Sequence, residues 1–518
     1  MSVITDRTQS IHVPIKKNSL ALFRSPKSKI KSKQAGKIVM LKNDVSLFSR
    51  LYIVMQHRDC DMSTFFKHEN HPYPPSLSDS GKLRLGKKSD LLKNLDEESH
   101  IGPPTSFDVK ALDGAAVVHL LPMTNITTFD EYADNVFIPH LISQLHNTKR
   151  VDVVWDTYIA SSLKETAREK RGKGVRRKVS GKTKVPGNWK EFLRDSANKQ
   201  ELFGFLSEKV ASPCVNFPDG KSVFITSGQN VVARGANHYM LPCDHEEADT
   251  RLLIHIQDSL ETGSTTCLVR TVDTDVLVIL ISKFHDLVAI YPSADIWIAF
   301  GTGKDFVHLH VNSICHRLGK ERSVALPGFH SFTGCDTTSG FFGKGKKVAL
   351  ETWNSLPEVT QTFSYMALNP YKHMDLDSQH FQILEHFTVL LYDKTSSLES
   401  VNEVRRVLFC QRNKTMENIP PTQDALIQHT KRAAYQTGIW ATSLLPQQNT
   451  PTPEGWGWTW EMENQSWFPV WTTLPISSKA CNELVKCGCK SKNGCSTRCA
   501  CKKVQWRCTE LCSCTCQK

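Results

Sequence analysis

Short apolar runs alternate with helix-length segments between about residues 105 and 350. Four runs are typical of buried strands: FDVKALDG, VDVVWD, CLVRTVDTDVLVIL and DIWIAF. The amphipathic stretch EEADTRLLIHIQDSL lies between the second and third of them. This alternation predicts an α/β fold, in which helices flank a mostly parallel central sheet.

The rest of the chain divides where the composition changes, and 518 residues are enough for roughly three domains. A breaker-rich linker, LPQQNTPTPEG, precedes a tryptophan-rich stretch, and a cysteine-rich tail follows. We expect five regions: a basic, partly ordered N-terminal region (1–104), the α/β domain (105–350), a helical extension (351–442), the linker with the tryptophan-rich segment (443–475), and a zinc-stapled module (476–518).

Acidic residues follow the predicted strands of the α/β domain. They are Asp113 after DVKAL, Asp156 after VDVVW, Asp273 and Asp275 in RTVDTDV, and Asp336 in TGCDTT. Ligands of open α/β sheets bind at the carboxyl ends of strands, so acids from several strands can converge there. Any one of them could instead be a turn or cap residue.

In two acidic groups, the backbone conformation decides which side chains point the same way. An extended backbone would point Asp273 and Asp275 to one face and bury VLVILI behind them. Glu246, Glu247 and Asp249 open a predicted helix, where residues three apart share a face and residues two apart do not. Spacing therefore leaves open whether Glu246 or Glu247 pairs with Asp249.

Clustered carboxylates repel one another unless cations compensate them. Hard oxygen ligands suit Mg²⁺ or Mn²⁺, and two such ions about 3.5–4 Å apart can hold both oxygens of a phosphodiester displacement. The acids therefore predict a two-ion nuclease site.

The ordered set of motifs resembles the PIN-like nuclease superfamily, and within it the flap endonuclease branch. The matching stretches are LDGAAVVHLL, VVWDTYIASSLKETAREKRG, EEADTRLL, VDTDVLVI and GCDTTSGFFGKGKKVAL, in the order of the family. The resemblance covers about residues 105–350. It implies metal-binding roles for Asp113, Asp156, Glu247, Asp249, Asp273, Asp275 and Asp336, and phosphate-binding roles for Lys164 and Arg168.

The sequence departs from the family at three points. The acidic pair is Glu-Ala-Asp instead of two glutamates, the gap from Asp249 to Asp273 is longer, and a preamble of about a hundred residues precedes Asp113. Substrate geometry is therefore not carried over. The sequence is also similar to animal proteins with an HEEADTR signature, for which a mobile-element origin is an alternative.

Two basic stretches are candidates for nucleic-acid contact. Eleven Lys or Arg lie between Lys164 and Lys190, and this run predicts either a channel for backbone phosphates or a solvated loop or nuclear signal. The stretch GKGKK, with a helix expected from about Lys346, predicts either a backbone clamp of helix-hairpin-helix type within residues 330–350 or an ordinary turn. The candidate residues are Lys170, Arg171, Arg176, Arg177, Lys178, Gly343, Lys344, Gly345, Lys346 and Lys347.

Nine of the 17 cysteines crowd into residues 487–516, at positions 487, 489, 495, 499, 501, 508, 512, 514 and 516. Dense thiolates without matching histidines suit zinc, and a disulfide-rich tail is the alternative. The tail resembles the CXC module of tesmin-type chromatin proteins, which implies DNA contact, while a protein-interaction module remains open. We expect Zn²⁺ at Cys487, Cys489, Cys495, Cys499, Cys501, Cys508, Cys512, Cys514 and Cys516.

The net charge of the chain and the motifs that it lacks narrow the expected function and location. The formal charge of +12 favours a polyanionic partner, MSVITDRTQS lacks a signal-peptide pattern, and no GxSxG motif points to acyl chemistry. We expect a nuclear, otherwise cytoplasmic, metal-dependent nuclease that acts on structured or single-stranded nucleic acid, with DNA as its substrate. The alternatives are an inactive nucleic-acid or chromatin-binding protein of the same fold and a domesticated mobile-element protein with protein partners.

Overall fold

The computed structural model describes residues 62–95, 102–159, 161–165, 174–410 and 415–477, together with Cys487, Cys489, Cys495, Cys499 and Lys502. Residues 61–482 form one compact unit, and residues 1–60 with 483–518 form a second. The sheet, the helices and the acidic residues discussed below all belong to the unit 61–482.

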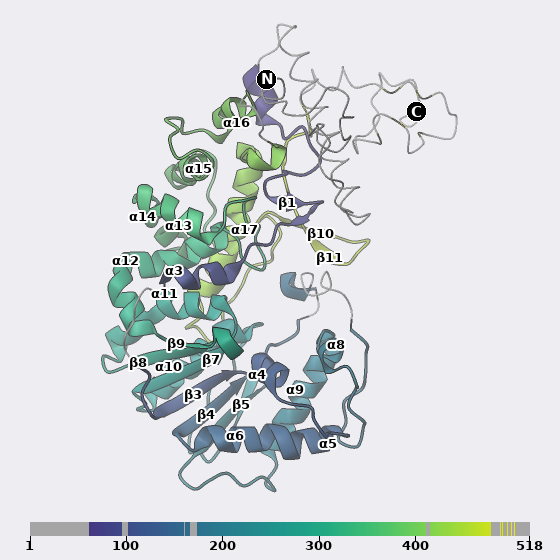
Figure 1. Ribbon diagram of the computed structural model, residues 1–518, viewed down its shortest axis with the longest axis vertical. Coiled ribbons are helices and arrows are strands. Elements are labelled where there is room, and N and C mark those ends of the chain that lie inside the picture. The colour runs from purple at the N-terminus through teal and green to yellow at the C-terminus, as the bar shows by residue number, and fades with distance from the viewer. Residues whose placement is uncertain are drawn as a thin grey trace, which may run out of the picture. The chain divides into compact units, whose positions relative to one another are not determined.

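A seven-stranded sheet lies at the centre of this unit, in the order β6-β5-β4-β3-β7-β8-β9 (Figure 1). Strands β3, β4, β5, β7 and β8 run parallel, whereas β6 and β9 are antiparallel edge strands. The prediction of a mostly parallel sheet is confirmed. The strands are β3 (Phe107–Asp113), β4 (Thr148–Val154), β5 (Ser222–Ser227), β6 (Asn230–Arg234), β7 (Thr266–Thr271), β8 (Asp295–Phe300) and β9 (Val307–His310).

One face of the sheet packs against helices from the first half of the unit. Val151 and Val153 of β4 and Val223 and Ile225 of β5 alternate toward this side and join one apolar core with the helices. Figure 1 shows α5, α6, α8 and α9 grouped there. The helices are α4 (Gly114–Leu120), α5 (Phe129–Tyr132), a π-helical turn (Ala133–Phe137), α6 (Ile138–Leu145), α8 (Trp189–Phe192) and α9 (Ser196–Ala211).

The segment CLVRTVDTDVLVIL, predicted as one strand, is a strand and a helix. Strand β7 ends at Thr271 and helix α11 (Thr274–Ile290) begins three residues later. The carboxylate of Asp273 caps this helix by accepting the N–H of Asp275 at 2.9 Å. Because all of residues 276–281 are buried, the run carries no helical period that would separate it from a buried strand. The expected burial of VLVILI is confirmed, and the expected extended backbone is wrong.

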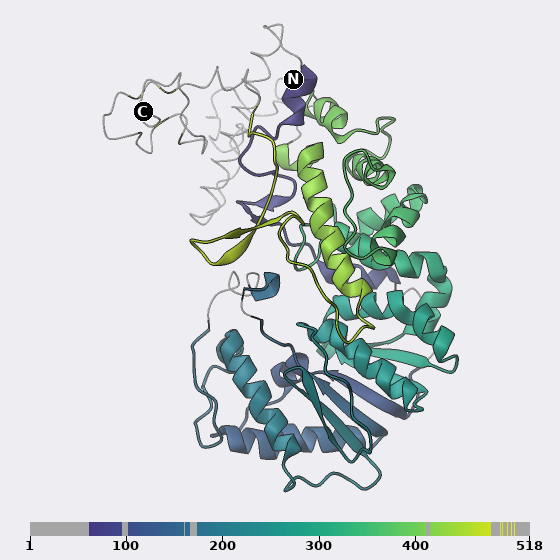
Figure 2. The same cartoon turned by 180° about the vertical axis from the view of Figure 1, so that it is seen from behind.

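The helices from α10 onward form a second group, in which α10, α12 and α17 contact α11. Helix α10 contacts β3 and β4, and α12 packs against α11 and α14. Figure 2 shows the long helix α17 beside the helices that precede it. The helices are α10 (Ala248–Glu261), α12 (Val311–Phe332), α13 (Lys346–Ser355), α14 (Val359–Leu368), α15 (Gln379–Tyr392), α16 (Val401–Cys410) and α17 (Gln423–Ala441).

The tryptophan-rich segment forms a hairpin of β10 (Trp458–Glu461) and β11 (Ser466–Pro469). Arg432 of α17 donates to the carbonyls of Gly457 and Val470, which fastens this segment to α17. Among the described helices, none has the length and apolar character needed to cross a bilayer.

Part of the predicted N-terminal region belongs to the same unit. It contains α2 (Met62–Lys67), the short strands β1 (Ser78–Asp79) and β2 (Lys82–Leu83), a 3-10 turn η1 (Lys88–Asp90) and α3 (Leu92–Leu95). We call residues 74–95 the N-terminal segment. Two backbone hydrogen bonds tie it to the loop before α13: Phe342 N–H donates to Ser76 O at 2.8 Å, and Gly340 N–H donates to Arg84 O at 2.7 Å.

Candidate metal centre

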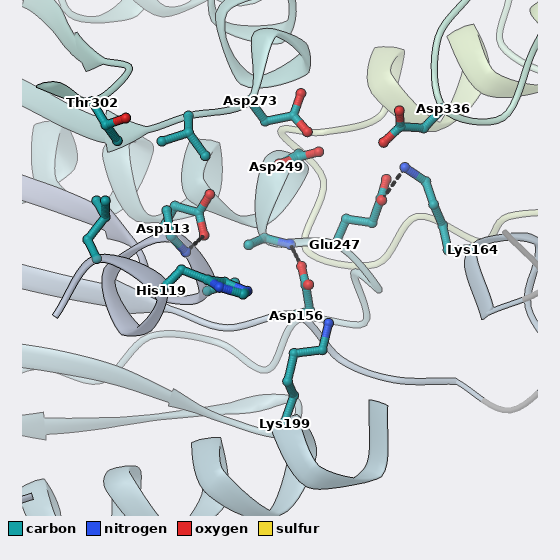
Figure 3. Close-up of a pocket in the computed structure, with 15 residues that line it drawn as sticks. Asp113, His119, Asp156, Lys164, Lys199, Glu247, Asp249, Asp273, Thr302 and Asp336 are labelled. Carbon is teal, nitrogen blue, oxygen red and sulfur yellow. Dashed lines mark hydrogen bonds and ion pairs between the residues drawn. The ribbon is translucent and has the colours of Figure 1, made fainter. Parts of the chain in front are cut away.

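A cavity of about 480 Å³ opens at the carboxyl ends of β3, β4 and β7. Figure 3 shows carboxylates from several elements around it. Six of the eight predicted acidic ligands line this cavity: Asp113, Asp156, Glu247, Asp249, Asp273 and Asp336. The fold therefore brings together acids that are up to 223 positions apart in the chain.

Asp113 ends β3 and caps α4. One oxygen accepts the N–H of Ala116 at 3.0 Å, and the other accepts the hydroxyl of Thr271 at 3.2 Å. A Cβ on the next residue, Gly114, would lie 2.1 Å from the ring of Trp155, so glycine is needed for this close approach. These contacts fix the Asp113 carboxylate at the edge of the sheet.

The beginning of α10 resolves the choice left open by spacing. Glu247 is still extended, Asp249 lies in the first turn, and both line the cavity. Asp156 accepts the N–H of Ala248 at 3.0 Å, which links the end of β4 to this turn. Glu246 lies elsewhere: it lines a neighbouring cavity and accepts the hydroxyl of Ser162 at 2.6 Å. Because the chain is extended through Glu247, the pair that shares the cavity is Glu247 with Asp249.

The third acidic group comes from α11 and from the loop between α12 and α13. Asp275 is only 1% exposed in the first turn of α11, and one oxygen each of Asp249, Asp273 and Asp275 lie within 4.8 Å of one another. Asp336 lies in a loop that closes on itself, because a Cβ at Gly334 would lie 2.7 Å from Gly340. Asp336 of this loop lines the cavity together with Asp273.

Lys88 of the N-terminal segment reaches this third group, and it was not among the predicted site residues. Its Nζ lies 2.9 Å from Asp273, 2.9 Å from Asp275 and 3.2 Å from Asp336. On the other side, His330 Nε2 donates to the second oxygen of Asp275 at 2.9 Å. Burial lowers the pKa of His330 to about 4, so this imidazole is neutral.

The carboxylates differ in how well their charge is compensated. Burial and Asp156 raise the pKa of Asp113 to about 7, and burial and Asp275 raise the pKa of Asp273 to about 6. Burial and Asp273 raise the pKa of Asp249 well above its usual value. Burial acts the same way on Asp275, but Lys88 outweighs it and lowers the pKa of that carboxyl. An additional cation would therefore stabilise the ionised forms of Asp113 and Asp249.

The donor set suits a hard divalent cation. Every candidate ligand supplies carboxylate oxygen, and the Asp249 carboxylate accepts no hydrogen bond from the described residues. Mg²⁺ and Mn²⁺ prefer oxygen donors of this kind. Asp249, one of the three acids whose oxygens lie within 4.8 Å of one another, is therefore open to such an ion, and Asp113, Asp156 and Glu247 line the same cavity.

Two lysines supply positive charge at the cavity. Lys164, predicted as a phosphate ligand, forms an ion pair with Glu247 (Figure 3). Burial alone would lower the pKa of Lys164, but Glu247 and Asp336 outweigh it and raise the pKa. Lys199 of α9 also lines the cavity and was not predicted, because nothing in its sequence surroundings marks it.

The other predicted basic residues lie in several settings. Arg168, Lys170 and Arg171 fall outside the described residues. Arg176 pairs with Glu201, and Arg177 donates to the carbonyl of Lys184 at 2.9 Å. Lys178 is exposed.

The GKGKK stretch includes a lysine that does not face solvent. Helix α13 begins at Lys346 as predicted, with Gly345 as its cap. Lys346 is only 3% exposed and donates to His330 O at 2.7 Å and to Thr333 Oγ1 at 2.8 Å. Burial lowers its pKa to about 7. The prediction that Lys346 contacts nucleic acid is therefore wrong for this conformation, whereas Gly343, Gly345 and Lys347 are exposed and Lys344 is half-buried.

The cysteine-rich tail belongs to the other compact unit. The Sγ atoms of Cys487, Cys489, Cys495 and Cys499 lie within 4.8 Å of one another, a grouping that could hold one metal ion. Four thiolates match a structural zinc site. The other five predicted ligands, from Cys501 to Cys516, lie outside the described residues.

No known family model and no curated protein matches the sequence. Among solved structures, the chain is similar to one described as the catalytic core of Rad2 in complex with DNA substrate. The two are 13% identical, with a TM-score of 0.26, over 61% of this chain and 91% of that chain. Chemistry is decided by the side chains of the site and not by likeness of this kind.

Proposed function

We propose that this chain is a divalent-metal-dependent nuclease that hydrolyses phosphodiester bonds in structured or single-stranded DNA. The observation that carries the proposal is the cavity at the carboxyl ends of β3, β4 and β7, where six acids and two lysines meet. Carboxylates in such number bind cations, and lysines beside them attract a polyanion. This combination suits a phosphate ester better than a neutral or cationic substrate.

Each group in the cavity has a role in this proposal. Asp113, Asp156, Glu247 and Asp249 would hold Mg²⁺ or Mn²⁺. When bound, the ion would activate a water molecule and offset the charge that develops on the phosphate. Lys164 keeps the Glu247 carboxylate in place and adds positive charge, and Lys199 enters from the opposite element, α9. Both lysines would draw the phosphate toward the acids.

The basic residues and the tail extend the proposal to binding. Lys178, Lys344 and Lys347 would contact backbone phosphates without base specificity, as the formal charge of +12 favours. The cysteine group would bind zinc and contact DNA or chromatin proteins, and a nuclear location follows from such partners.

A cleavage assay tests the proposal. The purified chain is incubated with Mn²⁺ and with flap, hairpin and single-stranded DNA and RNA, and wild type is compared with Asp249→Asn and with Asp273→Ala plus Asp275→Ala. We expect Asp249→Asn to lose at least about 100-fold in cleavage rate, because this acid would hold the ion that offsets the transition-state charge. The double variant should lose activity as well, because it leaves the ammonium of Lys88 in the cavity without two of its carboxylate partners.

Asp219→Asn is the matched control, because this aspartate is exposed in a turn away from the cavity. It should cleave as wild type does. Equal cleavage by wild type and the cavity variants would contradict the proposal. Binding of nucleic acid without cleavage would favour the inactive binding protein, whose support in the sequence is the shorter Asp249 in place of a second glutamate.

A further inference from the structure

The ammonium group of Lys88 occupies the meeting point of three carboxylates. Its Nζ lies 2.9 and 3.1 Å from the two oxygens of Asp273 and 2.9 Å from Oδ2 of Asp275. It lies 3.2 Å from Oδ2 of Asp336. One side chain from outside the sheet thus contacts all three acids of this half of the site.

Asp273 and Asp275 have further hydrogen-bond partners. His330 donates to Oδ1 of Asp275 at 2.9 Å, and the N–H of Asp275 donates to Oδ1 of Asp273 at 2.9 Å. The contrast is Asp249, whose carboxylate accepts no hydrogen bond from the part of the chain that the structure describes. Asp249 therefore keeps its oxygens for an added cation, whereas Asp273 and Asp275 already contact the ammonium of Lys88.

The N-terminal segment holds Lys88 in this position from both sides. Before it, Arg84 forms an ion pair with Glu417 at 3.1 Å and donates to the carbonyls of Pro75 and Ser78. After it, Leu91 and Leu95 are buried. The backbone on both sides of Lys88 is therefore held in place, which keeps its side chain close to the three acids.

We propose that Lys88 is a built-in cation that takes the place of a second divalent ion. In this arrangement Asp273, Asp275 and Asp336 bind the ammonium, and the site takes up one Mg²⁺ or Mn²⁺ in the half formed by Asp113, Asp156, Glu247 and Asp249. An ammonium and a divalent ion repel each other and need the same oxygens, so this half does not hold both. This inference rests on the proposed function, because both place divalent cations in the cavity. It replaces the expectation of two ions that was drawn from the sequence.

The number of bound ions tests this directly. Mn²⁺ is titrated into the nucleic-acid-free full chain and followed by electron paramagnetic resonance of free Mn²⁺, after Zn²⁺ has been supplied to saturate the thiolates. The double variant Asp249→Asn plus Asp113→Asn, which keeps Lys88, gives the number of Mn²⁺ ions bound outside the cavity. This number is subtracted from the count measured for wild type and for each Lys88 variant. Wild type should bind one Mn²⁺ and Lys88→Met two, because loss of the ammonium frees Asp273, Asp275 and Asp336.

Two variants serve as controls. Lys87→Met removes an exposed neighbouring lysine and should bind one ion, as should Lys88→Arg, which keeps the charge. Circular dichroism and thermal unfolding show whether each variant is folded, and Lys88→Gln replaces Lys88→Met if the latter is not. A gain of one ion in the uncharged variant supports the proposal, and an equal count in wild type and variant overturns it. Failure of the proposed function is a separate result, because it is read from cleavage, whereas the ion count needs no substrate.

Discussion

Two groups of buried carboxylates lie on this sheet, and they are compensated to different degrees. In β4, both oxygens of Asp152 accept from Arg150 at 2.7 Å, and His255 of α10 donates to Asp152 at 2.6 Å. Burial would raise the pKa of Asp152, but Arg150 outweighs it and lowers the pKa. In the cavity, burial and neighbouring acids raise the pKa of Asp113 and of Asp249 instead.

The difference indicates what each group does. The Asp152 group is complete in the folded chain, so its charges support the fold. The cavity group carries more negative charge than its lysines offset, so it costs stability until a cation binds. Sites kept in such a state are typical of function, since stability alone would favour their removal.

The largest effect is expected where the complete group is broken. Asp152→Ala leaves Arg150 buried without its main partner, and losing one member of a buried pair costs about 3–5 kcal/mol. We expect a loss of this size in the free energy of unfolding, measured by urea denaturation. Asp219→Asn, in an exposed turn, should change it by less than about 0.5 kcal/mol. A loss below about 1 kcal/mol in Asp152→Ala would show that the group does not support the fold.

The complete group should also give the protein a sensitivity to acid. Burial lowers the pKa of His255, which faces Asp152, Arg150 and Arg251. Below about pH 6.5 the unfolded imidazole binds a proton that the folded one does not, so stability falls as pH falls, by up to about 1.4 kcal/mol per pH unit. His255→Gln should make this dependence less steep between pH 6.5 and 5.5 in urea unfolding, while other histidines with a lowered pKa, such as His330 and His429, keep their share.

The control for this titration is His146→Gln, which alters an exposed histidine. It should keep the slope of wild type. An unchanged slope in His255→Gln would mean that other groups cause the acid sensitivity.

The smallest effect is expected where the incomplete group is relieved. Asp249→Asn removes an uncompensated charge, so the metal-free protein should gain about 1 kcal/mol in the free energy of unfolding. Added Mn²⁺ should raise the melting temperature of wild type and leave the variant unchanged, because ligands stabilise only proteins that bind them. Destabilisation of the metal-free variant would place Asp249 among the residues that support the fold.

The sequence was sufficient to predict that the acids at the strand ends lie in one site. Asp113 and Asp156 follow recognisable strands, and parallel strands bring their carboxyl ends to one edge of the sheet. The conformation of Asp273 and Asp275 was not predictable in the same way, because an apolar run buried on all sides fits a strand or a helix equally well.

Residues that reach the site through long-range packing carried no local signal. Lys88 lies in a region with no clear periodicity, and its role depends on contacts with residues 185 or more positions away. Lys346 follows the glycines of GKGKK, and this local sequence predicts a surface residue. Its ammonium is nevertheless buried, where it donates to His330 O and to Thr333. Local pattern predicts which face a residue takes on its own element, and tertiary packing decides what covers that face.

The N-terminal segment has a consequence for how the chain matures. Arg84 and Glu417 are 333 positions apart, so this part leaves the ribosome long before the residues that receive it. Closing contacts over such separations is slow compared with forming local helices. The ion pair that anchors this segment cannot form until Glu417 has been synthesised, so we expect the acidic centre of Asp273, Asp275 and Asp336 to gain its ammonium partner late.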